Sequence, residues 1–189
     1  MKMPIIASII IGFIFFITSS MSFAAKDGDL SLDLGSTGKK TITINVKKKI
    51  KISGLEDVEF GDWKIGDGDQ INENQICIYS NSASGYQVIA NSTNSDVDGE
   101  FAMTSDTDTK IKYELKWYDN TANSLTPEGI LLTEGSATTE FFNAERYSVD
   151  CASGKNSKLE LKIASSDLEQ VQGSETEYSD TLTLTVSPK

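Results

Sequence analysis

Apolar and polar residues alternate with a period of two along most of this 189-residue chain. Residues 110–117 read KIKYELKW, residues 158–163 read KLELKI and residues 181–186 read TLTLTV, so that aliphatic or aromatic side chains recur at every second position. Successive side chains of a β-strand point to opposite faces of a sheet, and this pattern therefore predicts half-buried antiparallel strands.

Shorter apolar runs fill the intervals between these strands, and clusters of Gly, Asn, Asp and Ser separate them. These runs are residues 57–60, 76–79, 86–90, 101–103 and 129–132. Helical periodicity is nearly absent, and the best candidate is a turn at residues 165–171, for which Ser165 or Ser166 provides the cap. Short strands at this spacing, without helices between them, predict an all-β, immunoglobulin-like sandwich of two sheets.

The first 25 residues have the pattern of a secretory signal peptide. Lys2 provides a positive charge, residues 5–17 are apolar, and small residues precede a cleavage site near Ala25. The alternative is a permanent membrane anchor, but an apolar run of about 13 residues is shorter than the roughly 20 that span a bilayer. We therefore expect an exported protein whose mature chain is not inserted in a membrane.

Composition excludes several functional classes. The chain has no histidine, which removes Ser-His-Asp, Cys-His and HExxH chemistry and the most common zinc ligand. A formal charge of -11 argues against nucleic acid as a partner. Paired carboxylates such as Asp57 with Glu59 fall on the solvent face of alternating strands. We expect no enzymatic activity, no metal and no cofactor.

Two cysteines, Cys77 and Cys151, are present. In an exported chain the expected state is a disulfide between them, and closing a loop of this length stabilises the fold by about 4 kcal/mol in the chain-entropy model. The alternative is a pair of free buried thiols. The CxxC spacing of redox and zinc motifs is absent.

The two ends of the chain complement each other. Leu182, Leu184 and Val186 share one face of the last predicted strand, and only Ser187, Pro188 and Lys189 follow it. If this strand is the sixth of an immunoglobulin-type sandwich, the seventh is missing and a groove stays open beside it.

A surplus alternating strand lies at the other end. Ile42, Ile44 and Val46 alternate with polar residues, Ile50 follows after three lysines, and a second candidate is formed by Leu30, Leu32 and Leu34. If the leading strand of one copy completes the sandwich of the next, the contact is head-to-tail and produces a fibre. The alternative is that residues 41–52 form the first strand of a closed sandwich.

Several motifs of this chain resemble those of subunits of chaperone-usher pili, in particular the archaic type that groups with spore coat protein U-like domains. The resemblance rests on the alternating strand from residue 41, on Val58-Glu59-Phe60-Gly61, on Cys77-Ile78-Tyr79-Ser80, on Cys151 with Gly154 and Asn156, and on the closing residues 178–186.

The resemblance implies an incomplete immunoglobulin-like fold with a signal peptide at residues 1–25, an extension at 26–49 and a sandwich at 50–189. A periplasmic chaperone and an outer-membrane usher would handle the subunit, which would join identical or related subunits by donor-strand exchange into a surface fibre for adhesion or biofilm formation. The donor residues would be Ile42, Ile44, Val46 and Ile50, and the acceptor-groove residues Leu182, Leu184 and Val186.

Two other functions are compatible with the same pattern. The first is a secreted monomeric binding module for a carbohydrate or another surface ligand, in which Trp63, Trp117, Tyr118 and Tyr147 provide the contacts. The second is a monomeric coat protein. Trp117 falls on the same face of its predicted strand as Ile111 and Leu115, which predicts a core position for it.

Overall fold

The computed structural model describes residue 27 and residues 35–95, 99–119, 129–173 and 176–189. The chain divides into two compact units, residues 1–46 and residues 47–189. The predicted signal peptide at residues 1–25 and the second donor candidate at Leu30, Leu32 and Leu34 lie outside the described residues.

In the first unit, no strand includes any of residues 35–46, and every one of these residues is exposed. The alternating residues 41–46 therefore do not form a strand in this chain. Alternation alone does not make a segment a strand, because a strand also requires a partner with which to form a hydrogen-bonded ladder.

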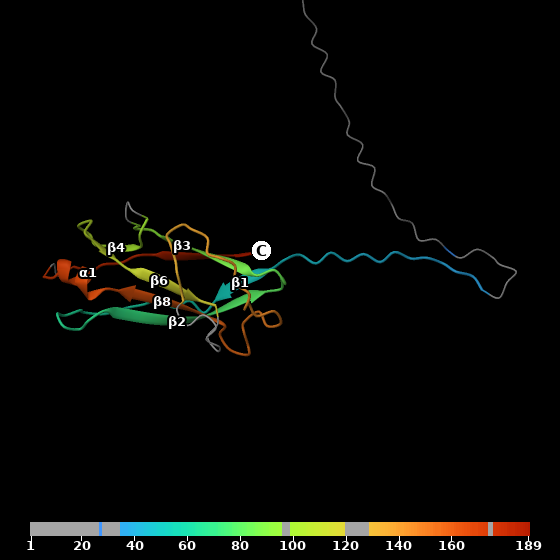
Figure 1. Ribbon diagram of the computed structural model, residues 1–189, viewed down its shortest axis with the longest axis horizontal. Coiled ribbons are helices and arrows are strands. Elements are labelled where there is room, and N and C mark those ends of the chain that lie inside the picture. The colour runs from blue at the N-terminus through green and yellow to red at the C-terminus, as the bar shows by residue number, and fades with distance from the viewer. Residues whose placement is uncertain (1–26, 28–34, 96–98, 120–128, 174–175) are drawn as a thin grey trace, which may run out of the picture. The chain divides into compact units, whose positions relative to one another are not determined.

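The second unit is a body of two antiparallel sheets that form the sandwich and a separate two-stranded hairpin (Figure 1). The larger sheet has the order β1-β2-β8-β6-β7, and its strands are β1 (Ile50–Ser53), β2 (Gln70–Ser80), β8 (Ser157–Ile163), β6 (Glu114–Tyr118) and β7 (Ile130–Leu131). A second sheet pairs β3 (Tyr86–Ser92) with β9 (Leu182–Pro188). The hairpin of β4 (Ala102–Thr104) and β5 (Lys110–Lys112) completes the described strands.

This topology is that of an immunoglobulin sandwich with six strands. A constant-type immunoglobulin domain has strands A, B, E and D in one sheet and C, F and G in the other. In chain order β1, β2, β3, β6, β8 and β9 take the places of A to F, and both sheets follow that pairing order. The predicted all-β sandwich is confirmed.

The core lies between the sheets. Its largest fully buried side chains are Trp117, Tyr86, Ile76, Ile78, Leu115 and Val88. Ile111, Tyr113, Leu115 and Trp117 are all buried, which confirms the parity predicted for residues 110–117. Buried apolar area of this kind is the main stabilising contribution to a small domain.

Three local predictions are wrong. Residues 110–117 are divided into β5 and β6, because β5 pairs with β4 whereas β6 pairs with β8. Residues 57–60 form no strand, although Phe60 packs against the core. The helix α1 (Ser165–Gln170) has no side-chain cap from either serine, and Asp69 instead accepts a hydrogen bond from the Ser165 N–H at 2.9 Å.

Two features that would indicate other functional classes were not found in the part of the chain that the structure describes. It contains no group of three or more His, Cys, Asp or Glu side chains arranged to hold a metal ion. Its helical segment is also too short to pass through a bilayer.

Candidate functional site

The last strand, β9, has one paired and one unpaired edge. Its register with β3 places Leu184 opposite Ala90. Direct hydrogen bonds flank this ladder, from the Thr93 N–H to the Thr181 carbonyl at 3.2 Å and from the Lys189 N–H to the Gly85 carbonyl at 3.1 Å. Among the described residues, no strand other than β3 pairs with β9.

The positions of these hydrogen bonds show which backbone groups face the unpaired edge. In an antiparallel pair, residues that bond to the partner strand alternate with residues whose N–H and C=O point away from it. Because residues 181 and 189 bond toward β3, so do Thr183, Thr185 and Ser187. The N–H and C=O groups of Leu182, Leu184 and Val186 therefore point to the opposite edge.

The side chains of the same three residues line the core. Leu182, Leu184 and Val186 are half-buried and pack against the buried cluster, whereas Thr183 and Thr185 are exposed. We define the acceptor edge as the unpaired backbone edge of β9 together with the side chains of Leu182, Leu184 and Val186. In the seven-strand immunoglobulin arrangement this is the place of strand G.

The opposite edge of the same sheet is covered. The N–H groups of Gly135, Thr138 and Phe141 donate to the carbonyls of Ala90, Val88 and Tyr86, each at 2.9 Å. Residues 135–141 thus shield β3 from solvent, in the way that folded proteins commonly protect an edge strand. The two edges of this sheet therefore differ: residues 135–141 cover the β3 edge, whereas no described strand pairs with the outer edge of β9.

A polar cluster holds the beginning of β9. Asp180 accepts hydrogen bonds from the Tyr113 hydroxyl (2.5 Å), the Thr93 N–H (3.1 Å) and the Thr93 hydroxyl (2.8 Å). Partial burial acts to raise the pKa of Asp180, but the hydrogen bonds from Tyr113, Ser92 and Thr93 outweigh it and hold that pKa below its ordinary value. Burial and this carboxylate also raise the pKa of Tyr113.

The end of β9 is held near the start of the body. The carbonyl of Lys189 accepts hydrogen bonds from Lys48 Nζ and, at 3.3 Å, from Ser82 Oγ. Asn81 fixes the adjoining backbone, since its Nδ2 donates to the Lys47 carbonyl at 3.0 Å and its Oδ1 accepts from the Lys49 N–H at 2.6 Å. Both ends of β9 are therefore fixed by contacts outside its own ladder.

The structure separates the four predicted donor residues into two groups. Ile42, Ile44 and Val46 are 85%, 84% and 77% exposed, a degree unusual for consecutive aliphatic positions. Ile50 instead begins β1, pairs with Ser80 and packs against the core. Ile50 is therefore part of the body, which corrects its assignment to the donor strand.

The expected disulfide is present. Cys77 of β2 and Cys151 are bonded with an S–S distance of 2.02 Å and a Cα–Cα distance of 5.8 Å. Both residues are buried. The bond fastens the loop before β8 to the middle of the larger sheet, and it is the kind of link that persists in an oxidising compartment.

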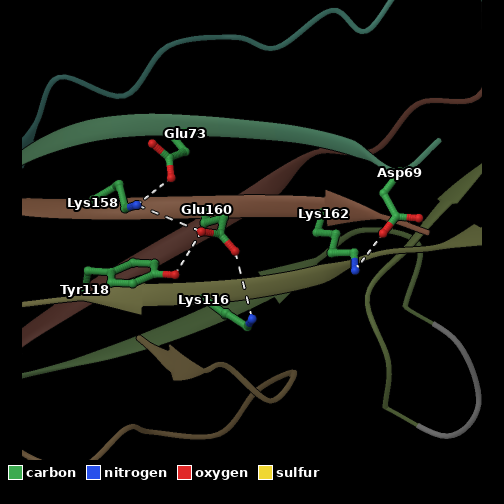
Figure 2. A network of polar contacts seen from close by, with 7 residues as sticks. All are labelled: Asp69, Glu73, Lys116, Tyr118, Lys158, Glu160 and Lys162. Carbon is green, nitrogen blue, oxygen red and sulfur yellow. Dashed lines mark hydrogen bonds and ion pairs between the residues drawn. The ribbon is translucent and has the colours of Figure 1, made fainter. Parts of the chain in front are cut away.

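The outer face of the larger sheet carries charged side chains (Figure 2). Lys158 Nζ lies 2.5 Å from Glu73 Oε1 and 4.1 Å from the centroid of the Tyr118 ring, and the Tyr118 hydroxyl donates to Glu160 at 2.8 Å. Partial burial, aided by Glu160, raises the pKa of Tyr118 to about 12. These side chains pair with one another across strands, as is typical of a solvated sheet face.

The aromatic residues of the alternative binding module are divided between core and surface. Trp117 is fully buried, so it is not available to a ligand, and Trp63 is half-buried with its Nε1 donating to the Gly68 carbonyl at 3.2 Å. Tyr147 is 96% exposed. A ligand contact that includes Trp117 is therefore excluded by its burial.

A scan against protein-family models and a search of curated proteins found no match to this chain. Among solved structures, it is similar to a chain of the chaperone–tip adhesin complex of CFA/I fimbriae biogenesis, with a TM-score of 0.51 and 20% identity over 74% of this chain and 41% of that chain. Two other structures match with lower TM-scores. They are CfaE, the adhesive subunit of CFA/I fimbria of enterotoxigenic Escherichia coli (0.47, 19% identity, 69% and 39% covered), and the CsuC–CsuE chaperone–tip adhesion subunit complex of archaic chaperone-usher Csu pili of Acinetobacter baumannii (0.42, 19% identity, 75% and 40% covered).

The chain spans about two fifths of the length of the solved chains that it matches. The likeness to the first of them concerns the fold alone: the β-sandwich of this chain also occurs in a chain of that complex.

Proposed function

We propose that this protein is a structural subunit of a surface fibre, in which residues 41–46 of one copy add a strand to the acceptor edge of the next. The observation that carries the proposal is the unpaired edge of β9, where the backbone groups of Leu182, Leu184 and Val186 face outward beside half-buried aliphatic side chains. A strand added there supplies the seventh strand of the sandwich.

The exposed residues of the extension have the chemistry that this edge requires. Burial of the three side chains of Ile42, Ile44 and Val46 stabilises the contact by about 1.5–3 kcal/mol each, and main-chain hydrogen bonds add to this. Because the donor and acceptor surfaces differ, the contact is heterologous and repeats head-to-tail without closing. Dissociation from such a contact is slow.

Charge supports the same association. Residues 35–46 contain two lysines and no acidic residue, whereas residues 47–189 contain 25 acidic and 13 basic residues. The segment at residues 35–46 of one copy is therefore attracted to the body of another, and opposite charges of this kind accelerate association.

The assembly route is part of the proposal. Residues 1–25 direct export, residues 26–46 are the extension and residues 47–189 are the body, so the extension ends three residues earlier than the sequence predicted. A periplasmic chaperone covers the acceptor edge until an outer-membrane usher joins the subunit to identical or related subunits, and the fibre then serves adhesion or biofilm formation. The disulfide and the likeness to a chain from a chaperone–tip adhesin complex support this route. The role is structural and not catalytic.

The test compares two substitutions in neighbouring residues of the extension. Ile44→Asp places a charge on the aliphatic face, whereas Thr43→Asp places the same charge on the polar face. In cells that assemble the wild-type protein, we expect Ile44→Asp to abolish the heat-sensitive ladder on denaturing gels and Thr43→Asp to keep it. If both variants keep the ladder, or if the wild-type chain stays monomeric, the proposal is overturned in favour of a closed secreted module.

A further inference from the structure

The segment that can act as a donor has a fixed end. Asn81 binds the backbone of Lys47 and Lys49 on both sides of Lys48, and Lys48 itself bonds to the Lys189 carbonyl. The body of each copy therefore begins at Lys47. A neighbouring copy is left with the residues up to Val46, of which Ile42, Ile44 and Val46 are the aliphatic members.

The acceptor edge determines which donor residues point their side chains toward the core. Residues directly opposite each other on paired strands point their side chains to the same face of the sheet. Leu182, Leu184 and Val186 face the core, so the aliphatic donor residues must lie opposite these three and not opposite the exposed threonines. A shift of one residue would turn the donor's threonines and Asn45 toward the core.

The direction of the donor follows from the architecture. Every strand pair of the two sheets is antiparallel, and strand G of an immunoglobulin sandwich is antiparallel to strand F. An antiparallel donor also meets the edge at its hydrogen-bonding positions, so each aliphatic residue exchanges both backbone bonds with the residue opposite it.

We infer that the donor binds antiparallel to β9 in one register, with Ile42 opposite Val186, Ile44 opposite Leu184 and Val46 opposite Leu182. This inference rests on the proposed function. A slip of two residues in one direction places Lys40 against Val186 and Val46 against Asp180. A slip of two in the other direction leaves Leu182 without a donor residue, because the donor ends at Val46. The stated register is the one that forms all three aliphatic pairs.

The register makes a geometric prediction for the exposed face of the new pair. Thr43 lies opposite Thr185, and Asn45 lies opposite Thr183, both at non-hydrogen-bonded positions. Such positions have Cα atoms about 4.5 Å apart, which is within the range of a disulfide. A parallel donor with the same aliphatic contacts would instead place Asn45 opposite Thr185. The antiparallel slip that leaves Leu182 without a donor residue would do the same.

The test uses two double variants of the full chain that share one cysteine. We expect T43C with T185C to give a ladder that survives heating in detergent and disappears after reduction, and N45C with T185C to give none. Mass spectrometry of the ladder identifies the bonded residues and shows that Cys77 and Cys151 remain paired. The single variant T43C, which can link at most two chains, is the control.

The outcomes separate the register from the proposed function. A covalent ladder from N45C with T185C and not from T43C with T185C would overturn the register and keep strand donation. Heat-sensitive polymers without a covalent ladder in either double variant would overturn the register as well. A wild-type chain that forms no polymer under the same conditions would overturn the proposed function itself.

Discussion

The hydroxyl of Tyr86 donates a 2.6 Å hydrogen bond to Oδ1 of Asp119, and this bond joins the two sheets inside the sandwich. Tyr86 begins β3 and is fully buried, and Asp119 directly follows β6 and is 8% exposed. The other carboxylate oxygen, Oδ2, accepts from the N–H groups of Phe142 (3.0 Å) and Asn143 (3.2 Å). Burial, with the Asp119 charge next to it, strongly raises the pKa of Tyr86.

Tyr86→Phe is expected to lower the free energy of unfolding by about 1.5–3 kcal/mol. The substitution keeps the ring in the core but removes one hydrogen bond from a buried carboxylate, and bonds to charged groups have contributions of this size. Urea unfolding at neutral pH measures the change. Tyr118→Phe is the control, because its hydroxyl bonds to Glu160 on the outer face and such surface contacts contribute about 0–1 kcal/mol. Equal losses in both variants would contradict the role of the Tyr86–Asp119 bond.

Asp180→Asn is expected to reduce the dependence of stability on acid pH. The pKa of Asp180 is held below its ordinary value of about 3.9, so the ionised carboxylate contributes stability above that pH and loses it as pH falls through the lower, folded-state pKa. At pH 7 the variant should be less stable by about 1 kcal/mol, since the site is only half-buried and solvent screens it.

The measurement is the urea midpoint of both chains between pH 7 and pH 2. The difference between wild type and Asp180→Asn should be largest at pH 7 and should narrow toward pH 2. Asp57→Asn removes the same charge from an exposed position and controls for net charge. A difference that stays constant over this range would show that the Asp180 carboxylate does not contribute through its ionised form.

Charge reversal in the extension is expected to slow assembly without changing the register. Lys39→Glu with Lys40→Glu removes positive charge from the segment that is attracted to the acidic body of another copy. Wild-type assembly should slow by about tenfold between low and high salt, because electrostatic steering is screened, and the variant should be slow at both. Light scattering during assembly measures the rates. A wild-type rate that does not depend on salt would contradict the attraction.

Much of the body could be predicted from local patterns. The alternation of residues 158–163 and 181–186 located β8 and β9 within one or two residues, and the parity of residues 110–117 placed Trp117 in the core. Such predictions succeed because the period of two is a direct consequence of strand geometry, and burial on one face selects apolar residues at every second position.

Contacts between distant segments explain the failures. Residues 110–117 read as one strand, but their two halves pair with different partners, and sequence parity carries no information about partners. The N–H of Ser165 at the start of α1 donates to Asp69, nearly a hundred residues earlier in the chain, and neither serine caps the helix. The apolar alternation continues from Ile42 across the lysines to Ile50, which is why Ile50 was predicted as a donor residue. In the structure Ile50 pairs with β2.

The amino-acid sequence alone determined that this protein is built of strands, which faces of those strands are apolar, and that two cysteines were available to join distant segments. Only the tertiary structure decided which edge of β9 is paired and where the body begins. The reason is physical. The face to which a side chain points depends on its own position in a strand, whereas a backbone N–H or C=O group is paired or unpaired only according to which strand lies beside it.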